Sequence, residues 1–185
     1  MSEAQFGAAK GFRTAITLNL GTGLAGGVVI NGTLLPGHSG LGGEFGHFAL
    51  PITALDLPLI RCGCGRMACT ETLIAGPGLT RIHHHLTGET LTPEAITTGD
   101  HPATMHIWLT LTAELLHILT MVIDPDCIVL AGGLSRAQNL IPRLNRALQT
   151  AALPGYGIPL LRLAEGGDTT GARGAAFAAL QEHAA

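Results

Sequence analysis

Residues 14–31, TAITLNLGTGLAGGVVIN, form two strand-like runs on either side of a glycine-rich bend. The runs TAITLNL (14–20) and GVVIN (27–31) are rich in apolar and β-branched residues, and Asn31-Gly32 is a strong signal for a tight turn. The bend GTGLAGG (21–27) precedes a strand where a dinucleotide-binding loop needs a helix, and the Gly-Lys-Ser/Thr of a Walker loop is absent. The stretch therefore predicts a β-hairpin whose first strand ends in a glycine-rich bend.

The rest of the chain alternates helices and strands. Irregular loops are expected over 36–46, which is mostly Gly, Ser and His, and from Pro51 into a group of cysteines. Strands are expected over 127–133, ending in a glycine turn, and over 158–163, and helices over 71–86 (interrupted at 76–78), 102–123, 137–151 and 172–183. This order predicts an α/β or mixed layered architecture. Residues 2–11 resemble the middle of a helix without an N-cap, so we expect the chain to start partway through a domain.

The composition argues against several classes of protein. The 185 residues are 46% hydrophobic and 12% charged, which is typical of a well-buried chain. A net charge of −3 with scattered Lys and Arg residues argues against a nucleic-acid surface. The longest apolar stretch, 115–123, carries His117 and is too short to span a bilayer, and the N-terminus lacks the pattern of a signal peptide. We therefore expect a cytoplasmic protein with neither a membrane nor a nucleic acid as partner.

The segment 61–71, RCGCGRMACTE, holds three of the four cysteines in the chain: Cys62, Cys64 and Cys69. A disulfide between Cys62 and Cys64 would close a strained ring, whereas three thiolates supply three corners of a tetrahedral zinc site. His47 is the preferred fourth ligand and His38 the weaker candidate. Such a zinc would be structural, because the protein fills every corner. Ordinary reduced cysteines on a loop remain the alternative.

The two glycine bends are candidate anion sites. The backbone N–H groups of GTGLAGG can point at phosphate oxygens, although a plain start of a hairpin explains the bend equally well. AGGLS (131–135) follows a predicted strand, at the edge of an α/β sheet where ligands bind. Cys127, inside that strand, is expected to be a buried core residue.

Two carboxylates flank the predicted metal site. If zinc ties His47 to the cysteines, Glu44 and Glu71 come near each other, and two carboxylates with an imidazole suit the hydroxyls of a sugar. Alternatively, each Glu is a solvated residue, and Glu71 favours the start of its helix through the helix dipole. The run His83, His84 and His85 is expected at the surface, because consecutive helical residues do not face one way.

Four segments together resemble the ROK family of bacterial sugar kinases and sugar-responsive repressors: GTGLAGGVVINGTLLPGHSGLGGEFGH, CGCGRMACTE, DPDCIVLAGGLS and GARGAA. The resemblance implies an actin-like, RNase H-type α/β ATPase fold with two lobes. It implies structural zinc at His47, Cys62, Cys64 and Cys69, and sugar contacts from Glu44, His47 and Glu71. It also implies ATP phosphates at the bend residues Gly21, Thr22, Gly23, Gly26 and Gly27, and adenosine near Gly132 and Gly133.

The implied activity is phosphorylation of N-acetyl-D-glucosamine, or a related hexose, at the 6-hydroxyl by ATP and magnesium. The alternative is a fragment of a non-catalytic sugar sensor or transcriptional regulator of the same family. The family's D-x-G-G-T loop and its Asn-Asp pair, which carries the general base, are not found in these residues. Residues 1–185 are therefore expected to be the C-terminal lobe of such a kinase, and homodimers are plausible by resemblance. Ala68 and Ala25 stand where the family pattern has glycine, and Ala68 would be strained if its backbone needs a positive φ.

Overall fold

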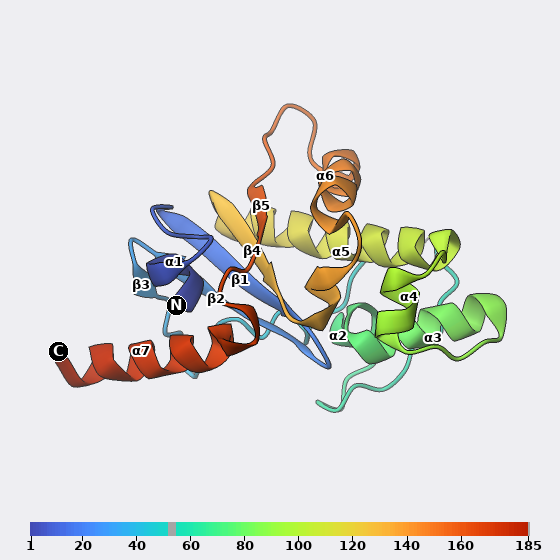
Figure 1. Ribbon diagram of the computed structural model, residues 1–185, viewed down its shortest axis with the longest axis horizontal. Helices are drawn as coiled ribbons and strands as arrows, with labels where there is room; N and C mark the ends of the chain where they lie inside the picture. The colour runs from blue at the N-terminus through green and yellow to red at the C-terminus, as the bar shows by residue number, and fades with distance from the viewer. Residues whose placement is uncertain (52–54, 185) are drawn as a thin grey trace.

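The computed structural model describes residues 1–51 and 55–184 (Figure 1). The loop predicted from Pro51 into the cysteines therefore lies partly outside the described residues. Over the rest of the chain, the predicted order of two strands, several helices and then strand, helix, strand, helix is confirmed.

One sheet of five strands organises the fold, in the order β3-β2-β1-β4-β5. The strands are β1 (Thr14–Leu20), β2 (Leu24–Ile30), β3 (Thr33–Leu34), β4 (Cys127–Ala131) and β5 (Leu160–Leu163). Strands β1, β2 and β3 pair antiparallel, as consecutive hairpins do, whereas β4 and β5 pair parallel and need helical crossovers. The predicted mixed α/β architecture is thus confirmed.

Strand β2 begins at Leu24, three residues earlier than predicted, because its pairing with β1 continues to Leu20 opposite Leu24. Gly26 and Gly27 therefore lie inside the strand, and the turn between β1 and β2 is limited to residues 21–23. A Cβ on Gly26 would lie 2.5 Å from the carbonyl oxygen of Thr17 and 2.9 Å from the Phe45 ring. Close packing, rather than a bend, explains the glycine at this position.

Seven α-helices and two 3₁₀ turns are found among the described residues: α1 (Ser2–Phe6), α2 (Glu71–Ile74), α3 (Gly76–Thr87), α4 (Pro93–Thr98), α5 (Pro102–Ile123), η1 (Gly133–Arg136), α6 (Leu140–Ala151), η2 (Gly167–Thr169) and α7 (Thr170–Ala184). The predicted interruption near residue 76 is confirmed, since extended backbone at Ala75 separates α2 from α3. Helix α4 and strand β3 were not predicted, because both are very short.

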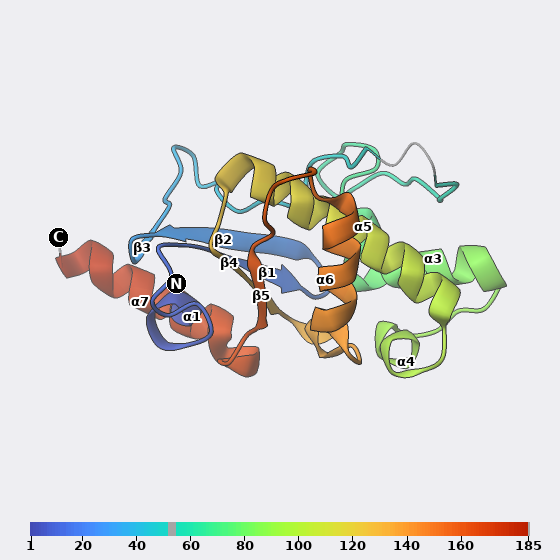
Figure 2. The ribbon, with the colours of Figure 1, turned by 90° about the horizontal axis from the view of Figure 1, so that it is seen from above.

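The two faces of the sheet pack against different layers (Figure 2). Ile16, Leu18 and Ile128 face the larger core, which includes the buried side of α5. The alternate residues Ala15 and Cys127 face a smaller core with the segment that follows α1. Figure 2 shows α5 on one side of the sheet and α1 and α7 on the other. Alternation along the strands thus separates the faces, and the prediction that Cys127 is a core residue is confirmed.

Helix α5 has 22 residues, which is long and apolar enough to cross a membrane by length and composition alone. It is longer than the apolar stretch singled out in the sequence, because residues 102–114 continue the same helix. Trp108, Leu111 and Leu115 are fully buried in the larger core. The indole N–H of Trp108 donates to the carbonyl of Ile74 at 2.8 Å. These contacts make α5 the central helix of the core.

The prediction that all three consecutive histidines lie at the surface is wrong for His83. Its side chain is buried, its Nδ1 lies 2.9 Å from Thr104 Oγ1, and its ring packs on His101 at 4.7 Å. His84 and His85 are exposed as predicted. Consecutive residues on α3 face different ways, and His83 is the one of the three that points at α5.

Glu3 joins the first helix to the last segment of the chain. The residue is 1% exposed, and its carboxylate accepts hydrogen bonds from the backbone N–H groups of Ala8, Glu165 and Gly166 and from Thr170 Oγ1, at 2.8–3.0 Å. Burial opposes ionisation of Glu3, but the four donors outweigh it and hold its pKa below the ordinary 4.5. A carboxylate 162 residues away in sequence therefore anchors the loop before α7.

Candidate metal centre and substrate site

Two distant loops run side by side at the predicted metal site. The backbone N–H of Thr70 donates to Phe48 O at 2.8 Å, and that of Glu71 donates to Gly46 O at 3.0 Å. A bridge between Ala49 and Cys69 extends the pairing. This short ladder brings segment 46–49 against the start of α2 and places the predicted histidine ligand beside the cysteines.

The cysteine loop is a tight knuckle. The N–H of Cys62 donates to Arg66 O at 2.8 Å, and the N–H of Gly65 donates back to Cys62 O at 2.9 Å. Gly65 has φ +90° and Ala68 has φ +57°, so both occupy the left-handed region. Successive turns of this kind fold the chain so sharply that thiols two to seven positions apart converge.

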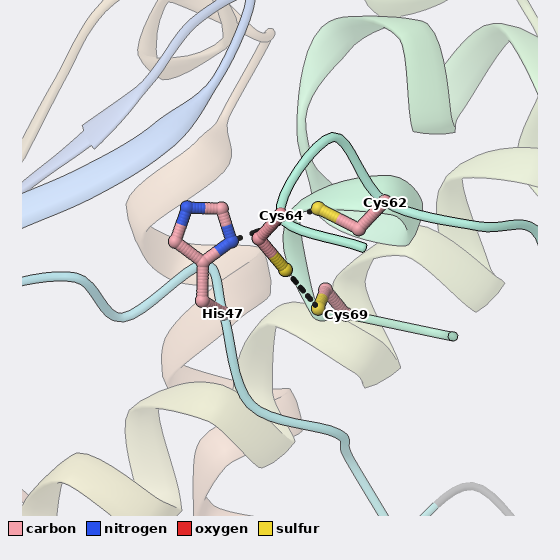
Figure 3. Close-up of side chains that lie close together, drawn as sticks. All are labelled: His47, Cys62, Cys64 and Cys69. Carbon is pink, nitrogen blue, oxygen red and sulfur yellow. Dashed lines mark hydrogen bonds between the residues drawn. The ribbon is translucent and has the colours of Figure 1, made fainter. Parts of the chain in front are cut away.

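The four predicted ligands form one group, which we name the His/Cys cluster: His47, Cys62, Cys64 and Cys69 (Figure 3). Their ligand atoms all lie within 4.8 Å of one another. Cys64 Sγ lies 3.5 Å from Cys69 Sγ, and Cys62 Sγ lies 3.6 Å from His47 Nδ1. Tetrahedral zinc, with Zn–S bonds of about 2.3 Å, places its sulfur ligands roughly 3.8 Å apart. The donor set therefore fits zinc, and His38 is exposed outside the cluster.

The thiols of the cluster differ in how easily they ionise. A hydrogen bond from the backbone N–H of Arg66 lowers the pKa of Cys64 from 9.0 to about 7. Burial raises the pKa of Cys69 to about 12. A bound cation would overcome that burial, because metal binding and thiol deprotonation are coupled.

Glu71 connects the cluster to the β1–β2 turn. Its Oε2 accepts from the backbone N–H of Leu24 at 3.3 Å, just past the turn. Its Oε1 lies 3.4 Å from Cys62 Sγ and 4.0 Å from His47 Nδ1. A Cβ on Gly23 would lie 3.1 Å from Oε2, so the turn passes close to the carboxylate. One side chain therefore contacts both the predicted metal site and the predicted phosphate site.

Glu44 lies on the opposite side of the imidazole, with its Oε2 3.5 Å from His47 Nε2. The imidazole thus presents Nδ1 to the cysteines and Nε2 to a carboxylate, which is the usual arrangement of a metal-binding histidine. The side chains of Glu44, His47 and Glu71 are 44%, 35% and 28% exposed, so all three remain open to a ligand. The structure brings together the three residues predicted to contact sugar.

The predicted nucleotide residues fall into two groups. Gly21, Thr22 and Gly133 line a hollow of 810 Å³ between α3, α4 and η1, which we name the η1 hollow. Gly26, Gly27 and Gly132 instead line a hollow of 600 Å³ between the sheet and α7, which Gly21 also reaches. Two features favour glycine at position 132: its φ is +86°, and a Cβ there would lie 2.5 Å from Leu20 O. The residues predicted to hold one nucleotide are therefore divided between two hollows, and Gly23 lines neither of them.

Comparison with protein families identifies the chain. The ROK family profile matches residues 1–182. The chain belongs to the ROK family. N-acetyl-D-glucosamine kinases of Salmonella paratyphi B and Salmonella newport are each 40% identical over 171 residues, which cover 86% of this chain and 56% of theirs. The chain therefore spans about half the length of these ROK relatives.

Solved ROK structures share the fold. The ROK hexokinase of Thermus thermophilus superposes with a TM-score of 0.80 at 32% identity, over 98% of this chain and 61% of that one. A ROK glucokinase of Streptomyces griseus, solved with glucose and AMPPNP, superposes with a TM-score of 0.81 at 26% identity. This match covers 95% of this chain and 63% of the glucokinase. The expected actin-like ATPase fold is confirmed, and the relatives are sugar kinases.

Ala68 is a strained departure from the ROK pattern, because the backbone there has the positive φ for which glycine is suited. Ala68→Gly is expected to raise the free energy of unfolding by about 0.5–1 kcal/mol, the relief of strain less the extra entropy of unfolded glycine. Urea unfolding followed by the fluorescence of Trp108, the only tryptophan, measures this.

Ala25 offers the matched control, as the other position where the ROK pattern has glycine. It lies in strand β2 opposite Asn19 and is not among the residues with positive φ. Ala25→Gly should therefore lower stability by about 0.5–1 kcal/mol, as glycine does inside a strand. Equal effects of the two substitutions would contradict the assignment of strain to Ala68.

Sequence reasoning missed Arg81, which lines the η1 hollow and also a smaller hollow beside Glu71. The one feature of the sequence that could have drawn attention to Arg81 is its isolation, since no other Lys or Arg occurs between Arg66 and Arg136. The N–H of Leu24 was also missed, because a backbone donor leaves no mark in a sequence.

Proposed function

We propose that this chain is the sugar- and zinc-binding lobe of a kinase that transfers phosphate from ATP to the 6-hydroxyl of N-acetyl-D-glucosamine or a related hexose. The position of Glu71 carries the proposal, because its carboxylate lies between the His/Cys cluster and the β1–β2 turn. The 40% identity with N-acetyl-D-glucosamine kinases supports the choice of sugar. The proposed partners are two small molecules, the sugar and ATP, and the proposed location of the protein is the cytoplasm.

The proposed zinc is structural. His47, Cys62, Cys64 and Cys69 would hold it, which leaves no open position for a metal-bound water. Because His47 lies three residues after Glu44 and 24 before Glu71, zinc would hold the two carboxylates at a fixed separation. The chemistry that zinc supplies is therefore positioning.

The proposed nucleotide site includes Gly21, Thr22 and Gly133, which line the η1 hollow, together with Gly23 of the same turn. Gly26, Gly27 and Gly132, which line the hollow beside α7, complete the set of proposed nucleotide residues. Magnesium would accompany the ATP. We assign no general base among these residues. The proposal places the base and the ATP-gripping loop in the part of the ROK kinases that this chain does not span.

Sugar binding tests the proposal. Titration calorimetry of N-acetyl-D-glucosamine into the zinc-loaded chain should detect binding, and Glu71→Gln should weaken it about 10-fold or more, since hydrogen bonds to a charged group contribute about 1.5–3 kcal/mol. Glu89→Gln, an exposed carboxylate beyond α3, is the control and should bind as the wild type does. Glucose and N-acetylmannosamine in the same assay define the preferred hexose.

A phosphoryl-transfer assay with ATP and magnesium in the same samples tests the kinase hypothesis directly. Formation of sugar 6-phosphate supports the kinase directly. Sugar binding without transfer fits a lobe that lacks the base, and equally a sugar sensor of the same family. Absence of sugar binding, or a Glu71→Gln variant that binds normally, contradicts the assigned site.

A further inference from the structure

Arg81 stands between two hollows. The first is the η1 hollow at the β1–β2 turn. The second, of 210 Å³, is lined by Cys62 and Glu71, and we name it the Glu71 hollow. Among the described residues, only Thr22, Pro77 and Arg81 line both. Arg81 is the single charged side chain of these three, so it lies where the proposed nucleotide and sugar sites meet.

The guanidinium of Arg81 has unused hydrogen-bonding capacity. Nη2 donates to the carbonyl of Thr72, and this is its only hydrogen bond among residues 1–51 and 55–184. Nε is buried and has no partner in that part of the chain. Guanidinium carries five N–H donors, and a buried polar group without a partner is costly.

The positive charge of Arg81 also lacks a counter-ion. No ion pair between Arg81 and a carboxylate forms within residues 1–51 and 55–184. Burial lowers the pKa of Arg81, although arginine keeps its proton at neutral pH. A partly desolvated cation with free donors is a binding site for an anion.

A role confined to anchoring α3 explains less. The bond to Thr72 O uses one donor, and a neutral polar side chain could provide it. The unpartnered Nε and the position between two hollows would then serve no purpose. Arginine is suited to phosphate because its planar fork donates two parallel hydrogen bonds to phosphate oxygens.

We propose that Arg81 binds the phosphate chain of the nucleotide at the boundary between the η1 hollow and the Glu71 hollow. This inference rests on the proposed function, since it takes the η1 hollow as the nucleotide site. Thr22, which lines both hollows with it, belongs to the turn predicted to contact phosphates. Arg81 would thereby orient the phosphates toward the sugar side.

The test compares ADP with adenosine by titration calorimetry, in magnesium, on the zinc-loaded chain. Arg81→Gln is expected to weaken ADP binding about 10-fold or more, as the loss of charged hydrogen bonds does, and to change adenosine binding less than about 2-fold. Arg81→Lys, which keeps the charge but not the fork, should fall between the wild type and Arg81→Gln. Arg146→Gln, an exposed cation on α6, is the control and should bind both ligands normally.

Each outcome of this test either supports or overturns the proposed role of Arg81. Unchanged ADP binding in Arg81→Gln, or equal loss of ADP and adenosine binding, overturns the inference in favour of a structural role. If Arg81→Gln does not fold, Arg81→Lys alone decides by the same ratio of ADP to adenosine affinity. A wild-type chain that binds sugar but not ADP overturns the inference and leaves the sugar site standing. A chain that binds neither ligand overturns the proposed function as well.

Discussion

Replacing Glu3 by alanine is expected to lower the free energy of unfolding by about 3–5 kcal/mol, because it leaves buried donors without an acceptor. The backbone N–H groups of Ala8, Glu165 and Gly166 all point at this carboxylate. The carboxylate also packs closely against the loop, since a Cβ on Gly166 would lie 2.9 Å from Glu3 Oε1. Urea unfolding at neutral pH, followed by Trp108 fluorescence, measures the loss.

Glu165→Ala is the matched control, because it removes an exposed carboxylate from the same loop and leaves the backbone donor in place. It should change stability by less than about 0.5 kcal/mol. Similar effects of the two substitutions would contradict the anchoring role of Glu3.

The anchor also predicts a dependence on pH. The pKa of Glu3 is lower in the folded protein than the ordinary 4.5, so the unfolded state binds the proton more readily. Stability from this carboxylate is thus fully present above pH 4.5 and is lost as pH falls through the folded pKa. Glu3→Gln should lack this part of the acid-induced loss.

Cys62→Ser is expected to abolish tight zinc binding and to lower the free energy of unfolding by about 4 kcal/mol, the contribution of a ligand present at a thousandfold its Kd. Cys62 Sγ contacts both His47 and Glu71, so its loss removes a metal ligand and frees the loop that carries the predicted sugar residues. Elemental analysis gives the zinc per chain, and urea unfolding gives the stability. Addition of a chelator to the wild type should reproduce both changes.

Cys127→Ala provides the control, since Cys127 is a buried thiol on β4 outside the His/Cys cluster. It should retain one zinc and lose only about 1 kcal/mol of stability, the usual effect of a modest core substitution. Wild-type protein purified without zinc, or Cys62→Ser protein that keeps it, would contradict the proposed metal site.

Short-range signals in the sequence predicted much of the fold. The β1–β2 hairpin, the break between α2 and α3 and the strand with Cys127 all rest on turn chemistry or on the period of apolar residues. The spacing of the cysteines, with His47, predicted the members of the His/Cys cluster. These features depend on neighbours along the chain, so the sequence alone indicates them.

The wrong predictions concern residues whose positions depend on packing between segments that are distant in sequence. His83 is buried because α5 covers one side of α3. Gly26 lies inside strand β2, and it is a glycine there because segment 43–46 crosses the strand closely, with the N–H of Gly26 donating to Gly43 O at 2.8 Å. Neither neighbour can be inferred from the residues adjacent in sequence.

The sequence by itself determined the order of elements, the family resemblance and the set of candidate metal ligands, since each is written in local pattern and spacing. Only the tertiary structure decided that Glu71 reaches the N–H of Leu24, 47 positions away, and that Glu3 holds a loop 162 positions away. It also gave Ala68 its positive φ and placed Arg81 between two hollows. Such contacts form because the sheet and its helices bring remote backbone donors and side chains together, and no local pattern encodes that meeting.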